Sequence, residues 1–169
     1  LLLRELRGEG GPFEVRDLGS GQLVLEGRGF AQLDGDGVLV AADRTVLVAR
    51  DRTGVERWRQ AELAGALAAS SRFVLAMEAP GGRLPRMGER VTLRVLDRAT
   101  GAPLGRLREV AWPFQVALVR DRIYLVSRSE VIDPDADVEA NEYRQELAAF
   151  TPTGDVARRF DLTPLSREC

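Results

Sequence analysis

The sequence predicts an all-β protein made of repeated four-stranded antiparallel units. Three observations favour this fold class: a hairpin pattern that recurs along the 169 residues, strand-like runs between its copies, and little sustained helical periodicity. The chain is 44% hydrophobic and 30% charged, so it can form a core and lacks the composition of a disordered segment. We expect one domain, residues 1–169.

Each copy of the hairpin consists of an apolar strand, a polar turn that ends in glycine, and a second strand. The copies cover residues 13–21, 47–54, 93–101 and 147–154. In the first three copies an aspartate closes the strand, where its side chain can accept from backbone N–H groups while glycine supplies a positive φ. These aspartates are Asp17, Asp51 and Asp97. The fourth copy has Thr151-Pro152, a different turn starter.

Two more strand-like runs precede each hairpin after the first, which makes the predicted repeat four strands long. They cover residues 30–33 and 38–42, 66–69 and 73–77, and 114–119 and 122–127. The turn Asp34-Gly-Asp-Gly37 is the most specific signature between them. Residues 56–69 are rich in Ala and Leu, which raises the alternatives of a short helix or a long loop, but we expect strand. The predicted units are residues 1–29, 30–63, 64–111 and 112–162.

Four-stranded antiparallel sheets that recur at about 40 to 50 residues are typical of β-propeller blades, which cover each other's faces. A β-sandwich or an open meander is the competing architecture, and the phase of the hairpin favours the propeller. We expect an array of about four blades. Because the first unit is one strand short, we also expect an incomplete propeller that belongs to a longer chain or is completed by a neighbouring subunit.

The second hairpin, residues 46–58, carries a resemblance to a known family. It contains an apolar strand, Asp51, Thr53-Gly54 and then Trp58, and it resembles the repeat of quinoprotein-like (PQQ-repeat-like) β-propellers. The other copies match in part: where this pattern has Trp, they have Leu25, Gly105 and Arg158. Such degenerate repeats occur in several propeller families, WD40-like ones included, so the resemblance implies a fold rather than a chemistry.

The resemblance implies two kinds of function. Enzymes of the family hold a quinone cofactor and a calcium ion on the propeller axis, whereas non-enzymatic relatives include extracytoplasmic envelope assembly factors that act as docking scaffolds. No catalytic, cofactor-binding or metal-binding residue of this chain can be matched, so we predict no cofactor and a non-catalytic protein-binding scaffold or structural subunit of a larger assembly, extracytoplasmic (periplasmic or in the cell envelope). The alternatives are a segment of a quinoprotein-like oxidoreductase and a ligand-binding or sensor domain.

Composition excludes several functions. The chain has no histidine, which removes the commonest general base and the usual zinc ligand. Its 24 basic residues, all arginine, and 26 acidic residues are interspersed, without the basic stripe of a nucleic-acid binder. No apolar run approaches the about 20 residues that a membrane-spanning helix needs. The one cysteine, Cys169, can form no disulfide within the chain.

The acidic segment Asp133 to Glu142 is a candidate calcium site. Carboxylates stand there at alternate positions: Asp133, Asp135, Asp137 and Glu139. Oxygen ligands at this spacing suit calcium. The helix-loop-helix calcium motif, however, needs Gly and Glu where this chain has Val138 and Arg144. A long solvated loop between two strands is therefore the favoured interpretation, and calcium binding stays open.

Two tryptophans and one loop complete the candidates. Trp58 and Trp112 could stack on a ligand, but we expect Trp58 to pack between adjacent blades. Residues 79–88 have the Gly and Pro content of a surface loop. They lack the Lys and Ser/Thr of a phosphate-binding loop.

Overall fold

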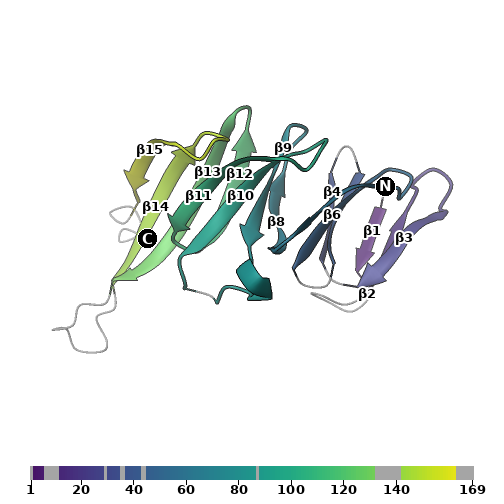
Figure 1. The fold of residues 1–169 in the computed structure, drawn as a ribbon, viewed down its shortest axis with the longest axis horizontal. Helices are drawn as coiled ribbons and strands as arrows, with labels where there is room; N and C mark the ends of the chain where they lie inside the picture. The colour runs from purple at the N-terminus through teal and green to yellow at the C-terminus, as the bar shows by residue number, and fades with distance from the viewer. Residues whose placement is uncertain are drawn as a thin grey trace. The chain divides into compact units, whose positions relative to one another are not determined.

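The computed structural model of the chain describes residues 2–5, 12–28, 30–34, 37–42, 45–86, 88–131 and 142–162. Antiparallel strands make up most of this part of the chain (Figure 1), joined by turns and one short 3-10 segment, Pro80–Gly82. The strands form four sheets, and in each sheet they lie in the order of the sequence. Every sheet is therefore a simple meander of neighbouring hairpins.

The sheets follow one another along the chain. The first contains β1 (Leu2–Glu5), β2 (Pro12–Arg16) and β3 (Leu23–Arg28). The second contains β4 (Phe30–Asp34), β5 (Gly37–Ala42), β6 (Val46–Asp51) and β7 (Glu56–Ala61). The third contains β8 (Leu63–Ala69), β9 (Phe73–Glu78), β10 (Val91–Asp97) and β11 (Pro103–Val110). The fourth contains β12 (Pro113–Val119), β13 (Arg122–Val131), β14 (Glu142–Phe150) and β15 (Val156–Asp161).

These sheets confirm the predicted all-β array. Residues 56–69 form β7 and β8, so the expectation of strand rather than helix is correct. The strand expected at residues 66–69 begins earlier, at Leu63. The chain forms two compact units: residues 1–84 with 94–104, and residues 85–93 with 105–169. We describe each unit separately, and the organisation as one domain stays a prediction.

The aspartate turns have the geometry that the sequence predicts. Asp51 Oδ1 accepts hydrogen bonds from the Thr53 backbone N–H (2.9 Å), the Thr53 hydroxyl (2.6 Å) and the Val55 N–H (3.1 Å). Asp17 and Asp97 accept equivalent bonds from their own turns. These hydrogen bonds stabilise the carboxylate form, so they lower the pKa of all three aspartates.

Acid should weaken these turns. The folded-state pKa of Asp17, Asp51 and Asp97 lies below the ordinary value of 3.8, so their stabilisation is present above that pH and is lost as pH falls through the folded pKa. We expect the triple Asp→Asn variant to have a lower Tm at neutral pH and a smaller further decrease below pH 3.8. Thermal unfolding followed by circular dichroism measures both quantities. Equal acid-induced decreases in the two proteins would contradict the prediction.

Trp58 lies in the core of the first unit. Its side chain is 7% exposed, and its indole Nε1 donates a hydrogen bond to the Arg98 carbonyl oxygen at 2.9 Å. A Cβ added at Gly101 would lie 2.7 Å from the Trp58 ring, so the ring packs against the turn between β10 and β11. The apolar cluster around it consists of Leu39, Leu47, Ala49, Leu63, Val74, Ala76 and Leu96. The expectation that Trp58 packs between neighbouring sheets is confirmed.

The glycine that ends each later hairpin turn lies against the last strand of the preceding sheet. A Cβ at Gly54 would meet the Val24 carbonyl oxygen of β3 at 2.8 Å, and one at Gly154 would meet the Arg106 carbonyl of β11. Gly54, Gly101 and Gly154 all have positive φ, which side chains disfavour. The hairpin turn therefore closes a strand pair and also packs one sheet against the next.

Candidate functional site

The fourth sheet (sheet 4), which lies in the second unit, buries its two faces unequally. On β13, Ile123, Leu125 and Ser127 are buried, and they alternate with the half-buried Tyr124 and Val126. Because strand side chains alternate between faces, the half-buried residues share the opposite face. We call that face the open face and define it by Ala117, Tyr124, Val126, Leu147 and Phe160.

The register of sheet 4 aligns the open-face residues across its strands. Val126 of β13 is paired with Leu147 of β14, and Leu147 with Phe160 of β15. Phe160 is 45% exposed, and all six residues of β15 are exposed. β14 buries the successive residues 148–150, as β5 does at positions 38–40 and β9 at positions 73–77, so the open face is covered at Ala149 and exposed toward Phe160.

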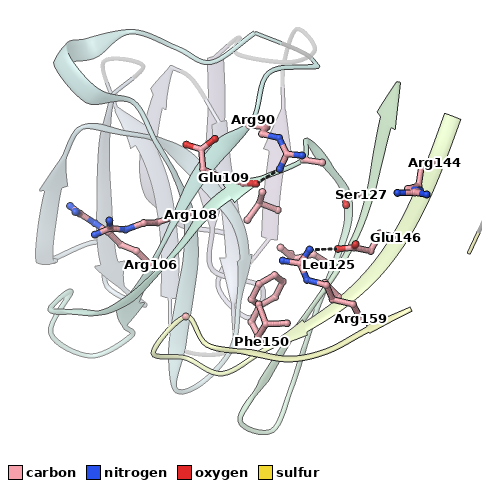
Figure 2. A pocket seen from close by; sticks show the side chains of 15 residues that line it. Arg90, Arg106, Arg108, Glu109, Leu125, Ser127, Arg144, Glu146, Phe150 and Arg159 are labelled. Atoms are coloured by element: carbon pink, nitrogen blue, oxygen red, sulfur yellow. Dashed lines mark hydrogen bonds and ion pairs between the residues drawn. The ribbon is translucent and has the colours of Figure 1, made fainter. Parts of the chain in front are cut away.

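The other face of sheet 4 borders a cavity of about 470 Å³ within the second unit. Its apolar lining includes Val110, Leu125, Ala148, Phe150 and Val156. Its charged lining consists of Arg90, Arg106, Arg108, Arg144 and Arg159 with Glu109 and Glu146. In Figure 2, Arg106 and Arg108 stand on one side, Arg144, Glu146 and Arg159 on the other, and Leu125 and Phe150 between them.

Strand alternation sets where the arginine side chains project. Arg106 and Arg108 alternate on β11 with Gly105, where an added Cβ would meet the Thr153 backbone of sheet 4, so their guanidinium groups point away from Leu125 and Phe150 (Figure 2). Arg159 is paired with Ala148, so it shares the buried face of sheet 4 rather than the open face. Glu109 has a φ of 51°, an uncommon conformation for a residue with a side chain, near the end of β11.

Three of the cavity arginines contact polar groups beside them. The Arg90 Nη1 donates to the Glu109 carbonyl oxygen at 2.6 Å. Arg159 forms an ion pair with Glu146 at 3.5 Å, and Arg144 lies 3.9 Å from an Asp161 carboxylate oxygen. The Arg144 and Arg159 side chains are 65% and 59% exposed. The lining thus presents more cationic than anionic groups at a partly solvated surface.

A second, smaller cavity of about 220 Å³ lies in the first unit. It is lined by Arg50, Arg57, Ser71, Arg98 and Ala99. Arg50 donates to the Gly54 carbonyl oxygen at 2.9 Å, and Arg57 pairs with Asp51 at 3.3 Å. These arginines therefore support the second hairpin turn, which gives them a structural role.

Several candidates suggested by the sequence do not form a site in the described residues. Residues 132–141, which hold most of the acidic segment, lie outside them. Within the described ranges no group of three or more Cys, Asp or Glu could hold a metal ion, and no helix is long and apolar enough to span a membrane. Trp112 is half-buried in the segment between β11 and β12. The arginine cavity was not predicted from the sequence.

No protein-family model and no curated protein matches the sequence. Solved structures do. BamB from Moraxella catarrhalis is 18% identical with a TM-score of 0.46, covering 90% of this chain and 59% of that one. The computationally designed Ika8 protein is 15% identical with a TM-score of 0.57, covering 94% and 48%. Quinohemoprotein alcohol dehydrogenase ADHIIG from Pseudomonas putida HK5 is 13% identical with a TM-score of 0.59, covering 93% and 32%.

These comparisons show the fold. The alcohol dehydrogenase is a β-propeller of the PQQ type, so its similarity agrees with the resemblance of residues 46–58. The chain is accordingly an all-β, propeller-like array of antiparallel sheets. It spans 59% or less of the length of each of these solved chains. At such low identities, similarity of fold carries no information about activity.

Proposed function

We propose that the chain is a non-catalytic β-propeller module that binds another protein through the open face of sheet 4. The partial exposure of apolar side chains on this face carries the proposal. Ala149 is buried there, whereas Tyr124, Val126 and Leu147 are half-buried and Phe160 is exposed. A sheet face with this composition is stabilised when a second apolar layer packs on it.

The open face has the features of a protein interface. Its apolar residues form a continuous cross-strand row, Val126, Leu147 and Phe160, next to Tyr124. Aromatic side chains at the centre of such a patch provide most of the binding energy of protein complexes. We propose that the partner presents an apolar β-sheet face, because sheets pack face to face at about 10 Å through interdigitated side chains.

The positions of the shifted ionisable groups also support a non-catalytic role. Among the described residues, the lowered pKa values are those of Asp17, Asp51 and Asp97, whose hydrogen bonds hold their own turns together, and of Glu56, which accepts from Arg59 on the same strand. Shifted groups at a catalytic site usually lie together in a cleft. An extracytoplasmic location belongs to this proposal, in line with the family resemblance.

Site-specific photocrosslinking tests the proposal. A photoreactive residue in place of Phe160 should yield one discrete protein adduct in cells that produce the protein. The same residue in place of Leu18, an apolar residue that is 68% exposed in the first unit, should yield none. Leu147→Asp should abolish the adduct at position 160, and the purified partner should restore the adduct with the purified module.

Four outcomes would overturn the proposal or revise the partner. Equal adducts at positions 160 and 18, or no adduct at 160, would remove the open face as an interface. An adduct with twice the mass of the chain would identify a second copy as the partner. Stoichiometric binding of pyrroloquinoline quinone with calcium, together with dye-linked dehydrogenase activity, would favour the oxidoreductase alternative.

A further inference from the structure

We infer that the arginine-lined cavity of the second unit binds an extended acidic segment of a partner protein, with one apolar side chain of that segment on the cavity floor. This inference rests on the proposed function, because it supplies the chemistry of a partner. It concerns a different surface: Arg159 and Phe160 are neighbours on β15 and project to opposite faces of sheet 4.

Charge complementarity is the first argument. The chain as a whole has a formal net charge of -2, yet arginines outnumber carboxylates around this cavity. Arg90 precedes β10, whereas Arg144 and Arg159 lie on β14 and β15, so these arginines stand on different sides of the cavity (Figure 2). A ligand inside the cavity would therefore meet positive charge from more than one side.

The hydrogen-bonding capacity of the arginines is the second argument. A guanidinium carries five N–H donors in a planar fork that matches a carboxylate. Arg90 uses one such donor on the Glu109 carbonyl oxygen, and Arg159 contacts Glu146 through Nη1. Further donors on these side chains can bind ligand carboxylates in the bidentate geometry that makes such bonds strong.

The apolar floor selects a peptide among anionic ligands. Leu125, Ala148 and Phe150 are buried yet border the cavity, and Val156 adds an apolar edge. A phosphate or sulfate polymer offers no group for this floor, whereas an acidic peptide can place an apolar side chain on it between two carboxylates. The cavity volume of about 470 Å³ lies in the range of ligand-binding pockets, about 300 to 1,000 Å³.

Fluorescence anisotropy with the intact chain tests this inference. The probe is a short fluorescein-labelled peptide of alternating Asp and Glu with one central Phe. We expect saturable binding that weakens as salt is added, because partly exposed charge pairs are screened. The double variant Arg144→Gln/Arg159→Gln should bind about tenfold more weakly, a loss of about 1.4 kcal/mol.

A neighbouring residue supplies the matched control. Arg158→Gln removes the same charge from the same strand, but Arg158 is paired with Ala149 on the open face, so binding should stay within about twofold of the unaltered chain. A probe with Ser in place of Phe should bind several-fold more weakly because it leaves the floor unfilled. Circular dichroism melting of each variant confirms that it is folded.

The results separate this inference from the proposed function. No saturable binding, equal losses in the Arg158→Gln and Arg144→Gln/Arg159→Gln variants, or tighter binding of polyphosphate than of the peptide would overturn the acidic-segment inference. The crosslinking result at Phe160 is independent of these measurements. If that adduct persists while the peptide fails to bind, the proposed function stands and the inference falls; if the adduct is absent, the proposed function falls.

Discussion

Replacement of Trp58 by alanine should lower the free energy of unfolding by about 3 to 5 kcal/mol. The indole is 7% exposed, packs among the buried residues of the first unit and donates a hydrogen bond to the Arg98 carbonyl oxygen. The truncation leaves a cavity and removes the donor from that carbonyl. It also removes the ring that packs against Gly101. The truncation therefore combines three losses at one position.

Urea unfolding followed by tryptophan fluorescence and circular dichroism measures the change for Trp58→Ala. The control is Trp112→Ala. Because Trp112 is half-buried, its truncation should lower the free energy of unfolding by less than that of Trp58. Trp58→Phe should recover part of the lost stability by filling much of the cavity while leaving the Arg98 carbonyl without its donor. Equal losses for both alanine variants would mean that Trp58 has no special position in the core.

The Gly105→Trp variant should be destabilised by about 3 kcal/mol or more, although it introduces tryptophan at the position that Trp58 occupies in the second hairpin. A Cβ at Gly105 would overlap the Thr153 backbone and the Pro152 carbonyl oxygen. Backbone atoms of a turn cannot rotate away as a flexible side chain can. The fourth hairpin turn thus occupies the space that an indole would need.

A matched substitution separates overlap from the general cost of adding a tryptophan. Leu104→Trp introduces the same side chain one position earlier on β11, where Leu104 is 44% exposed, and should change stability by less than about 1 kcal/mol. Differential scanning calorimetry of both variants gives the comparison. A Gly105→Trp protein as stable as the unaltered chain would show that the fourth turn can move to admit the consensus residue.

The fold could be predicted because its determinants are local in sequence. Asp51 and Gly54 form one turn within a few residues, and the side chain of Asp51 bonds to the N–H groups that follow it. The same chemistry recurs at Asp17 and Asp97. The strands between the turns follow from apolar patterns of a few residues. A single sequence contains all of this information.

The open face and the arginine-lined cavity could not be predicted from the sequence, because each depends on which residues meet across the fold. Arg106, Arg144 and Arg159 resemble ordinary surface charges in the sequence, and only the pairing of the strands brings them to one cavity. The exposure of the open face could not be predicted from the sequence either. The buried run at positions 38–40 and the half-open run at positions 123–127 are both largely apolar, so composition alone cannot tell how many faces are covered.

The order of strands within the sheets has a consequence for how the chain reaches its structure. Every strand pairs with neighbours that are adjacent in the sequence, so no sheet requires a segment made much later in synthesis. Closing short loops costs little entropy, and proteins dominated by local contacts fold faster than those with long-range strand pairing. Each sheet can therefore form its hydrogen bonds as soon as its last strand leaves the ribosome or a translocation channel.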